Sequence, residues 1–274
     1  MTVVVKIGGA KAVDPAGAVA DIADLIGDGE PVVVVHGGST AVDDLLERLD
    51  IEPTYVETPD GVVGRFTDAE TMEAFTMAMG RVNTELVATF REAGVDAVGL
   101  SGVDGGLITG PRKSAVRVVE DGKKKIKRGD HSGRIESVNA DLLETLLAQG
   151  YTPVTGPPML ADDGVPVNTD ADRAAAAVAG ALGGRLVVLT DVAGVYADPD
   201  DPSTLIESVR TPAEYDALTD AAEGFMTKKV MAATEALERG ATEVVVADAN
   251  ADAPVTGALG ESGTHIHASA LEDT

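Results

Sequence analysis

Two apolar runs near the N-terminus each end in a pair of glycines. The runs are Val3–Ile7, followed by Gly8 and Gly9, and Val32–His36, followed by Gly37 and Gly38. Runs of β-branched residues of this length are typical of buried parallel strands, and ligands in open α/β sheets bind at the carboxyl ends of such strands. Glycine lets backbone N–H groups approach an anion, and Lys6 adds a positive charge. One such pair is explained well enough as a tight strand-to-helix turn, but two beside a lysine predict an anion site.

Strands alternate with helices along the rest of the chain. We expect strands near residues 2–7, 31–36, 96–100, 151–155, 185–190 and 242–247, and helices near 17–27, 39–49 and 170–182. This repetition predicts an α/β fold with a mostly parallel open sheet flanked by helices. Glycines at the end of the Ala-rich helix favour a boundary there. We therefore predict two lobes, an N-terminal lobe of residues 1–180 that binds the acceptor and a C-terminal lobe of residues 181–274 that binds the nucleotide.

Two of the expected helices begin with the spacing of a capping box. Thr67 precedes Glu70 by three residues, and Thr169 precedes Asp172 by three residues. In this motif the threonine caps the first turn and the acid bonds back to the threonine N–H group. Capping is therefore an alternative explanation for Asp172 taken alone.

Composition narrows the class of protein and of partner. Acidic residues outnumber basic ones by 46 to 21, for a formal net charge of −25, which disfavours nucleic acid or an anionic membrane as a partner. With aromatic residues at 3%, this charge is typical of a halophilic protein, with an ordinary acidic protein as the alternative. The absence of cysteine excludes disulfides and thiolate chemistry. Because a strand is predicted at the very start, we expect no signal peptide. The longest apolar stretch, residues 174–182, is too short to span a bilayer, so we expect a cytoplasmic protein.

One segment of this acidic chain is strongly basic. The stretch from Arg112 to Arg134 holds nine of the 21 basic residues, and it alternates around Val116, Val118 and Ile126. With a turn at 121–122, the pattern predicts a projecting β-hairpin. A solvated surface hairpin is one explanation. The other is a site that attracts an anionic partner, because a concentrated basic patch steers such a partner.

The sequence has no Walker motif and no protein-kinase glycine-rich loop, so any use of ATP follows another pattern. A helix expected to begin at 225 carries Lys228 and Lys229 near its start. Lysines there oppose the helix dipole, which favours an anion that compensates them. Two solvated lysines are the alternative, and this alternative is weaker for Lys229.

Six short motifs in order resemble the amino-acid kinase family, specifically its acetylglutamate-kinase branch. The resemblance covers nearly the whole chain. The motifs are Lys6–Gly9, His36–Gly38, Arg65 before a Thr-Asp-x-Glu helix start, Asn168-x-x-x-Asp172, Thr190–Val195 and Met226-x-x-Lys229-Val230.

The resemblance implies transfer of the γ-phosphoryl group of Mg-ATP to a side-chain carboxylate. It assigns the stabilisation of the transferring phosphoryl group to Lys6 and Lys229, with Asp172 holding both lysines in place. It implies ATP and Mg²⁺ as cofactors, with the Mg²⁺ held through the ATP phosphates. The implied substrate-binding residues are Gly37, Gly38, Arg65 and Asn168, and the implied phosphate- or nucleotide-binding residues are Gly8, Gly9, Thr190, Asp191 and Tyr196.

The segments Gly129–Ile135 and Arg65–Asp68 resemble one subgroup of this branch. Its members phosphorylate glutamate or 2-aminoadipate carried on a small acidic amino-group carrier protein of the LysW type, in arginine or lysine biosynthesis. The resemblance also implies a homodimer. The basic segment would dock the carrier through Lys123, Lys124, Lys125, Lys127 and Arg128. Acetylglutamate kinase is the alternative substrate assignment. A non-catalytic nucleotide-binding regulator on the same fold is a further alternative, disfavoured by the retention of both lysines and Asp172.

Overall fold

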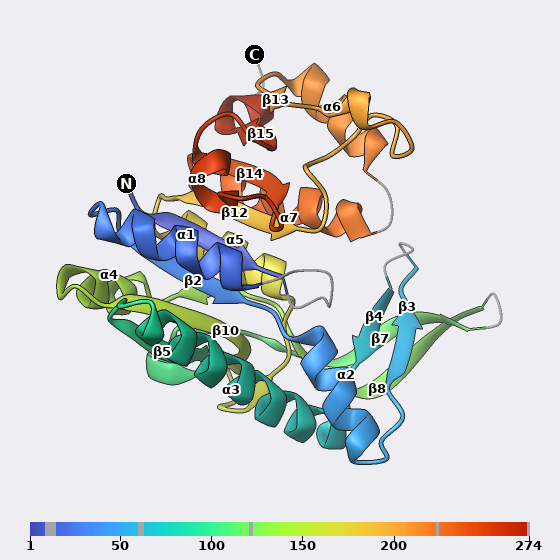
Figure 1. The fold of residues 1–274 in the computed structure, drawn as a ribbon. Coiled ribbons are helices and arrows are strands. Elements are labelled where there is room, and N and C mark those ends of the chain that lie inside the picture. Colours follow the sequence, from blue (N-terminus) through green and yellow to red (C-terminus); the bar gives the residue numbers. More distant parts are fainter. Residues whose placement is uncertain (9–14, 60–62, 121–122, 223–224, 273–274) are drawn as a thin grey trace.

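The computed structural model describes residues 1–8, 15–59, 63–120, 123–222 and 225–272. Within these residues a sheet of 11 strands runs through the centre of the molecule (Figure 1). Its strands are β1 (Val3–Ile7), β2 (Val32–His36), β5 (Ala97–Gly102), β6 (Ile108–Gly110), β9 (Ser137–Val138), β10 (Thr152–Ala161), β11 (Pro166–Val167), β12 (Arg185–Thr190), β13 (Ser208–Val209), β14 (Glu243–Asp248) and β15 (Thr264–His267). The order is β13-β15-β14-β12-β1-β2-β10-β6-β9, with β5 and β11 paired to β10.

Most neighbouring strands of the sheet run parallel, as the sequence predicts. Strand β1 pairs in parallel with β2 and β12, and β10 pairs in parallel with β2, β5 and β6. The antiparallel pairs β14–β15, β10–β11 and β6–β9 each involve a short or late strand. The α/β fold class with a mostly parallel sheet is confirmed.

Helices cover both faces of the sheet. They are α1 (Pro15–Gly27), α2 (Ser39–Arg48), α3 (Ala69–Glu92), α4 (Ala140–Ala148), α5 (Ala171–Ala181), α6 (Pro212–Ala221), α7 (Phe225–Glu238) and α8 (Pro254–Leu259). Helices α1, α3 and α8 contribute to one buried cluster, and α4, α5 and α7 contribute to the other. No helix among the described residues is long and apolar enough to cross a membrane.

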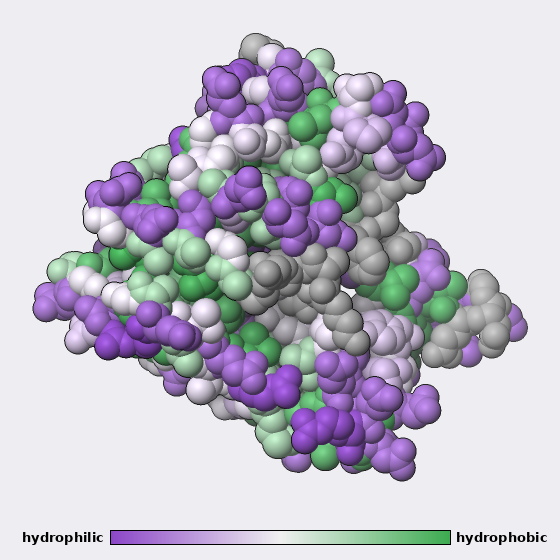
Figure 2. All heavy atoms as spheres, in the orientation of Figure 1, coloured by the Kyte–Doolittle hydropathy of each residue, from purple (hydrophilic) through white to green (hydrophobic). Residues whose placement is uncertain are grey.

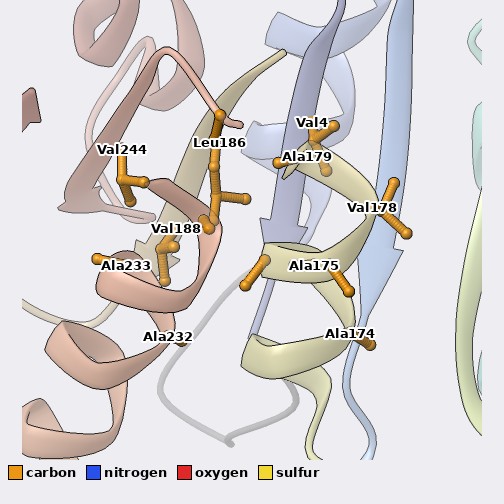
Figure 3. Packing of buried hydrophobic residues seen from close by; sticks show 14 of the residues in the cluster. Val4, Ala174, Ala175, Val178, Ala179, Leu186, Val188, Ala232, Ala233 and Val244 are labelled. Atoms are coloured by element: carbon orange, nitrogen blue, oxygen red, sulfur yellow. The ribbon is translucent and has the colours of Figure 1, made fainter. Parts of the chain in front are cut away.

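Side-chain alternation along β1 decides which face each of its residues serves. Val3 and Val5 lie in the cluster of α1 and α3, whereas Val4 packs with the alanines of α5 (Figure 3). Because successive side chains of a strand point to opposite faces, Lys6 shares the α5 face with Val4. The small side chains of α5 let this helix lie close to the sheet, and all residues from Ala174 to Gly180 are buried. The strand therefore directs Lys6 toward the start of α5.

Two helix starts differ from the sequence prediction by one residue. Asp68 rather than Thr67 caps α3, accepting a hydrogen bond from the Thr71 N–H group. Asp170 rather than Thr169 caps α5, accepting from the N–H groups of Asp172 and Arg173. The capping box predicted at Thr67 was wrong, and the cap offered as the alternative explanation for Asp172 does not form, because an aspartate follows each threonine and can reach the first-turn N–H groups itself. The carboxylate of Asp172 is therefore not part of a cap.

Two antiparallel hairpins project from the body side by side (Figure 1). One joins β3 (Thr54–Glu57) to β4 (Val63–Phe66), and the other joins β7 (Arg112–Glu120) to β8 (Lys123–Gly133). The second is the hairpin predicted from the basic segment, and its predicted turn at 121–122 lies outside the described residues. The predicted lobe boundary at 180 falls between α5 and β12, inside one continuous sheet. The division into two lobes stays a prediction.

Candidate active site

The carboxyl ends of the central parallel strands meet at one edge of the sheet. Lys6 pairs in register with Val35 of β2 and with Val188 of β12, so these three strands end at nearly the same level. Gly8 after β1, Gly37 and Gly38 after β2, and the polar residues Thr190 and Asp191 at the end of β12 lie at this edge. This is the edge at which open α/β sheets bind ligands.

Three charged side chains from three elements meet there. The Lys6 Nζ atom lies 2.6 Å from one carboxylate oxygen of Asp172, and the Lys229 Nζ atom of α7 lies 3.5 Å from the other. Each of the three side chains is at most 13% exposed. Asp172 lies in the first turn of α5, the helix that covers the face of the sheet to which β1 directs Lys6. The structure thus brings together the three residues to which the sequence resemblance assigns catalysis.

The electrostatics of this group keep Asp172 ionised. Burial alone would raise the pKa of Asp172, but the charges of Lys6 and Lys229 outweigh it and hold that pKa below its ordinary value. Burial, followed by the charge of Lys6, lowers the pKa of Lys229, and Asp172 opposes this change. One carboxylate therefore holds two cations close together, and one positive charge in this group remains uncompensated.

Replacing Asp172 with asparagine is expected to lower the free energy of unfolding at pH 7 by about 3 kcal/mol, because two partly buried ammonium groups lose their partner. The folded-state pKa of Asp172 is depressed, so its stabilising contribution is complete above its unfolded pKa, about 4, and is lost as the pH falls through the folded value. Urea unfolding of both proteins at several pH values measures this difference. Asp170→Asn is the matched control, because asparagine also caps helices, and an equal loss in it would contradict the assignment.

The glycine pairs differ in how much of their backbone is available to a ligand. The Gly37 N–H group donates to the Ile7 carbonyl at 3.2 Å, so it already takes part in joining β2 to β1. Gly38 caps α2, and a Cβ atom there would lie 2.6 Å from the Met79 sulfur, so a larger residue at this position would displace the Met79 side chain of α3. Gly8 directly follows β1, whereas Gly9 lies outside the described residues.

Arg65 lies on β4 and faces the start of α2. Its Nη2 atom donates to Asp43 at 2.5 Å, to the Ser39 carbonyl at 3.2 Å and to the Tyr55 hydroxyl at 3.3 Å. The side chain is 8% exposed, and its Nε atom is buried with no hydrogen-bond partner among the described residues. A buried guanidinium N–H without an acceptor is costly, so an oxygen that accepted from this atom would stabilise the arrangement.

Asn168 joins the basic hairpin to the strand that carries Arg65. Its side-chain amide donates to the Thr67 hydroxyl at 2.9 Å, and its backbone N–H donates to the His131 carbonyl at 2.8 Å. The His131 N–H donates in turn to the Thr67 carbonyl at 2.7 Å. These bonds fix the base of the β7–β8 hairpin beside the residues that follow Arg65.

The residues assigned to the nucleotide lie beyond β12. Thr190 is buried at the end of the strand and donates through its hydroxyl to Asp191 at 3.1 Å, while Asp191 is exposed. Tyr196 is half-buried and forms an isolated bridge with Leu205. These positions are at the same sheet edge as Lys6, and their nucleotide-binding roles stay predictions.

The basic residues of the β7–β8 hairpin lie on two different faces. Lys127 extends over the ring of Phe66, and its Nζ atom lies 4.4 Å from the ring centroid. Phe66 directly follows Arg65 in the sequence. Lys123 and Lys125 share the face of Lys127, whereas Lys124 and Arg128 lie on the opposite face together with Ile126, which is 66% exposed. Hydrophobic side chains stand out on the projecting hairpins in Figure 2. Lys127 lies closest to the acceptor residues, and the others remain exposed.

Three contacts at this site were not predicted from the sequence. Asp43 and Tyr55 hold the Arg65 guanidinium, and the Lys228 Nζ atom donates to the Val63 carbonyl at 2.6 Å, joining α7 to the β3–β4 hairpin. Asp43 is one acid among many in this chain, and its neighbours in sequence carry no motif. The sequence offers no local signal for any of the three contacts.

Comparison with known proteins agrees with this geometry. The model of the amino acid kinase family matches residues 1–248. The chain is 42% identical over 267 residues to a LysW-aminoadipate kinase of Deinococcus radiodurans, covering 96% of this chain and 91% of that protein. It is 43% identical over 247 residues to an acetylglutamate kinase of Methanopyrus kandleri, covering 89% and 93%.

Among solved structures, the chain is similar to N-acetylglutamate synthase from Neisseria gonorrhoeae, with a TM-score of 0.78 and 24% identity. The alignment covers 100% of this chain but only 60% of that protein, so it shows the fold alone. The family model and the relatives confirm the resemblance found in the sequence and the enzyme class, a phosphotransferase, and this class implies the use of ATP. The chain belongs to the amino acid kinase family.

Proposed function

We propose that this enzyme uses ATP to phosphorylate the side-chain carboxylate of glutamate or 2-aminoadipate attached to a small acidic carrier protein of the LysW type. The observation that carries the proposal is the basic hairpin beside Arg65 on a chain with a net charge of −25. The relatives named as LysW-aminoadipate kinases support the same substrate class. The product would be an acyl phosphate in arginine or lysine biosynthesis.

The chemistry requires positioning and charge stabilisation more than proton transfer. The acceptor carboxylate is already ionised at neutral pH, so it attacks the γ-phosphorus without a general base. Lys6 and Lys229 reach the site from opposite elements and stabilise the negative charge on the transferring group. Asp172 forms ion pairs with both ammonium groups and so holds them in place. Mg²⁺ would be held by the ATP phosphates and, when bound, would neutralise their charge.

Arg65 is the proposed clamp for the α-carboxylate of the acceptor. Its Nε atom, which has no hydrogen-bond partner among the described residues, can donate to an oxygen of that carboxylate. Asp43 and Tyr55 hold the guanidinium from the other side, which limits the rotation of the side chain. The acceptor would then lie between Arg65 and the glycines at the start of α2.

Arg65→Lys is expected to raise the KM of the acceptor about tenfold or more, because lysine keeps the charge but loses the Nε donor and the planar guanidinium that Asp43 and Tyr55 hold. Steady-state kinetics with each substrate varied in turn measures this change, and the affinity for ATP should stay close to that of the wild type. Arg81→Lys on the exposed face of α3 is the matched control. An equal weakening of acceptor and ATP binding would show that Arg65 does not bind the acceptor.

The hairpin explains how an acidic carrier could reach this clamp. Lys127 lies over Phe66, one residue from Arg65, and the exposed lysines continue from it toward the hairpin tip. Basic residues arranged in this way attract an acidic surface and orient it, with its attached amino acid directed at the acceptor site. A substrate of small size would need no such extension.

A panel of acceptors tests the proposal. Carrier-linked glutamate, carrier-linked aminoadipate, N-acetylglutamate and free glutamate are each supplied with Mg-ATP, and ADP release is followed. We expect release with at least one carrier-linked substrate and little with the free amino acids. Release with N-acetylglutamate alone would favour acetylglutamate kinase, which the relative from Methanopyrus kandleri supports. No release with any acceptor would favour the non-catalytic regulator.

A further inference from the structure

A buried histidine lies directly before the second glycine pair. His36 is 2% exposed at the end of β2. Its Nδ1 atom lies 3.1 Å from the Gly37 carbonyl oxygen, and its Nε2 atom lies 3.0 Å from the side-chain nitrogen of Asn83 in α3. The motif at the end of β2 and the long helix α3 are thereby joined through one imidazole ring.

The surroundings fix which atoms donate. The Asn83 amide nitrogen also lies 2.9 Å from the Val154 carbonyl oxygen, which can only accept, so the amide cannot be turned the other way. An amide nitrogen only donates, so the His36 Nε2 atom must accept. The proton of the neutral ring is then on Nδ1 and is donated to the Gly37 carbonyl. Burial lowers the pKa of His36, with the Gly37 bond opposing it, which keeps the ring neutral near pH 7.

Two glycines make room for this pair. A Cβ atom at Gly156 of β10 would lie 2.7 Å from the His36 carbonyl oxygen and 3.1 Å from its Nε2 atom. A Cβ atom at Gly99 of β5 would overlap the Asn83 side-chain oxygen. The strands beside the pair therefore leave a space that His36 and Asn83 fill, and a side chain at Gly156 or Gly99 would collide with them.

The bond to Gly37 determines where the next N–H group points. In a planar trans peptide the carbonyl of one residue and the N–H of the following residue point in opposite directions. With the Gly37 carbonyl held toward the buried imidazole, the Gly38 N–H points away from it, at the start of α2. Gly38 is the N-cap residue of α2, so this N–H group lies at the N-terminal end of that helix, at the sheet edge where β2 ends.

We propose that His36 and Asn83 are positioning residues that hold the Gly37–Gly38 peptide so that the Gly38 N–H group donates to the acceptor carboxylate or the transferring phosphoryl group. The inference rests on the proposed kinase reaction but not on which acceptor carries the carboxylate. It gives a function to the histidine of the motif and to Asn83, which lies in no motif of the sequence.

Asn83→Leu tests the proposal, because leucine is close in size and cannot donate. We expect kcat to fall about tenfold to a hundredfold, as a small displacement of a positioned group does, with ATP affinity by calorimetry within about twofold of the wild type. Thr84→Val is the matched control, since the Thr84 hydroxyl donates to the Gly80 carbonyl on the exposed side of the same helix. A kcat within about twofold of the wild type, or a parallel loss of ATP affinity, would overturn the proposal.

A spectroscopic measurement decides the matter if Asn83→Leu does not fold. Two-dimensional ¹H–¹⁵N NMR of the wild type, with His36 assigned by comparison with His36→Gln, reports which ring nitrogen carries the proton. We expect the neutral Nδ1–H form at pH 7, and the Nε2–H form would contradict the proposed bond to Gly37. This readout needs no acceptor, so it separates a failure of the proposed function from a failure of this inference.

Discussion

Replacing Lys229 or Lys6 with alanine is expected to lower kcat by about a hundredfold or more, with little change in the KM of ATP or of the acceptor. Each variant loses a positive charge that acts mainly in the transition state. The structure gives the reason: both ammonium groups are held within 3.5 Å of one buried carboxylate, at the edge where the strands end. Pre-steady-state measurement of ADP formation separates the chemical step from product release.

Lys228→Ala provides the matched control for this prediction. Lys228 is the neighbour of Lys229 on α7, but its Nζ atom donates to the Val63 carbonyl of the β3–β4 hairpin. We expect a decrease in kcat of less than about tenfold, since one contact between α7 and that hairpin is lost and no charge at the Asp172 group changes. Near-normal turnover in Lys229→Ala, or equal losses in the two variants, would contradict the role given to Lys229.

Reversing the exposed hairpin charges should have the second largest effect. Changing Lys123, Lys124, Lys125 and Arg128 to glutamate replaces four positive charges with four negative ones, and it leaves Lys127 over Phe66. We expect kcat/KM for the carrier-linked substrate to fall by about a hundredfold or more, because the attraction becomes repulsion. Reaction with a small acyl-glutamate, where it is measurable, should be unchanged. Steady-state kinetics with both substrates measures the difference.

The control carries the same change of net charge elsewhere. Arg48, Arg81, Arg91 and Arg210 are exposed and lie outside the hairpin, so reversing them should affect both substrates slightly and equally. Raising the salt concentration should weaken the carrier reaction of the wild type, because screening shortens the reach of exposed charges from about 8 Å to about 3 Å at 1 M. An unchanged kcat/KM for the carrier-linked substrate in the hairpin variant would contradict docking at the hairpin and would favour acetylglutamate as the substrate.

The fold was predictable where the signal is local. The strands Val3–Ile7, Val32–His36 and Arg185–Thr190 agree with the sequence prediction to within one residue, because runs of β-branched residues identify buried strands by themselves. The basic hairpin was predictable for a similar reason, since its alternation is local. The order of the strands in the sheet was not predictable in detail, because it depends on which distant segments pair.

The helix caps show where local signals fail. Thr67 and Asp68 are both good caps in isolation, and the sequence alone does not decide between them. In the structure Thr67 is buried and accepts a hydrogen bond from Asn168, which lies 101 residues away in the sequence, so Asp68 takes the cap. The N-cap of α3 therefore depends on the contact between Thr67 and Asn168, which are far apart in the sequence.

Some residues of the candidate site could be predicted from the sequence, and others could be found only in the structure. Lys6, Asp172 and Lys229 could be grouped from the sequence through the family resemblance, and the structure brings them together. Asp43 could not be found, because it is 22 residues from Arg65 on another element and belongs to a chain rich in acids. The bond between His36 and Asn83 spans 47 residues and was equally hidden. The roles given to these residues in binding and catalysis stay predictions until the variants are measured.

The most direct test of the account is a competition between two acceptors for one enzyme. Carrier-linked glutamate or aminoadipate and free N-acetylglutamate are mixed at equal concentration with Mg-ATP and hydroxylamine, which converts acyl phosphates to hydroxamates that mass spectrometry distinguishes. We expect the hydroxamate to form almost entirely on the carrier-linked side chain, and we expect this preference to decrease when the hairpin charges are reversed. Hydroxamate formed mainly on N-acetylglutamate would contradict it.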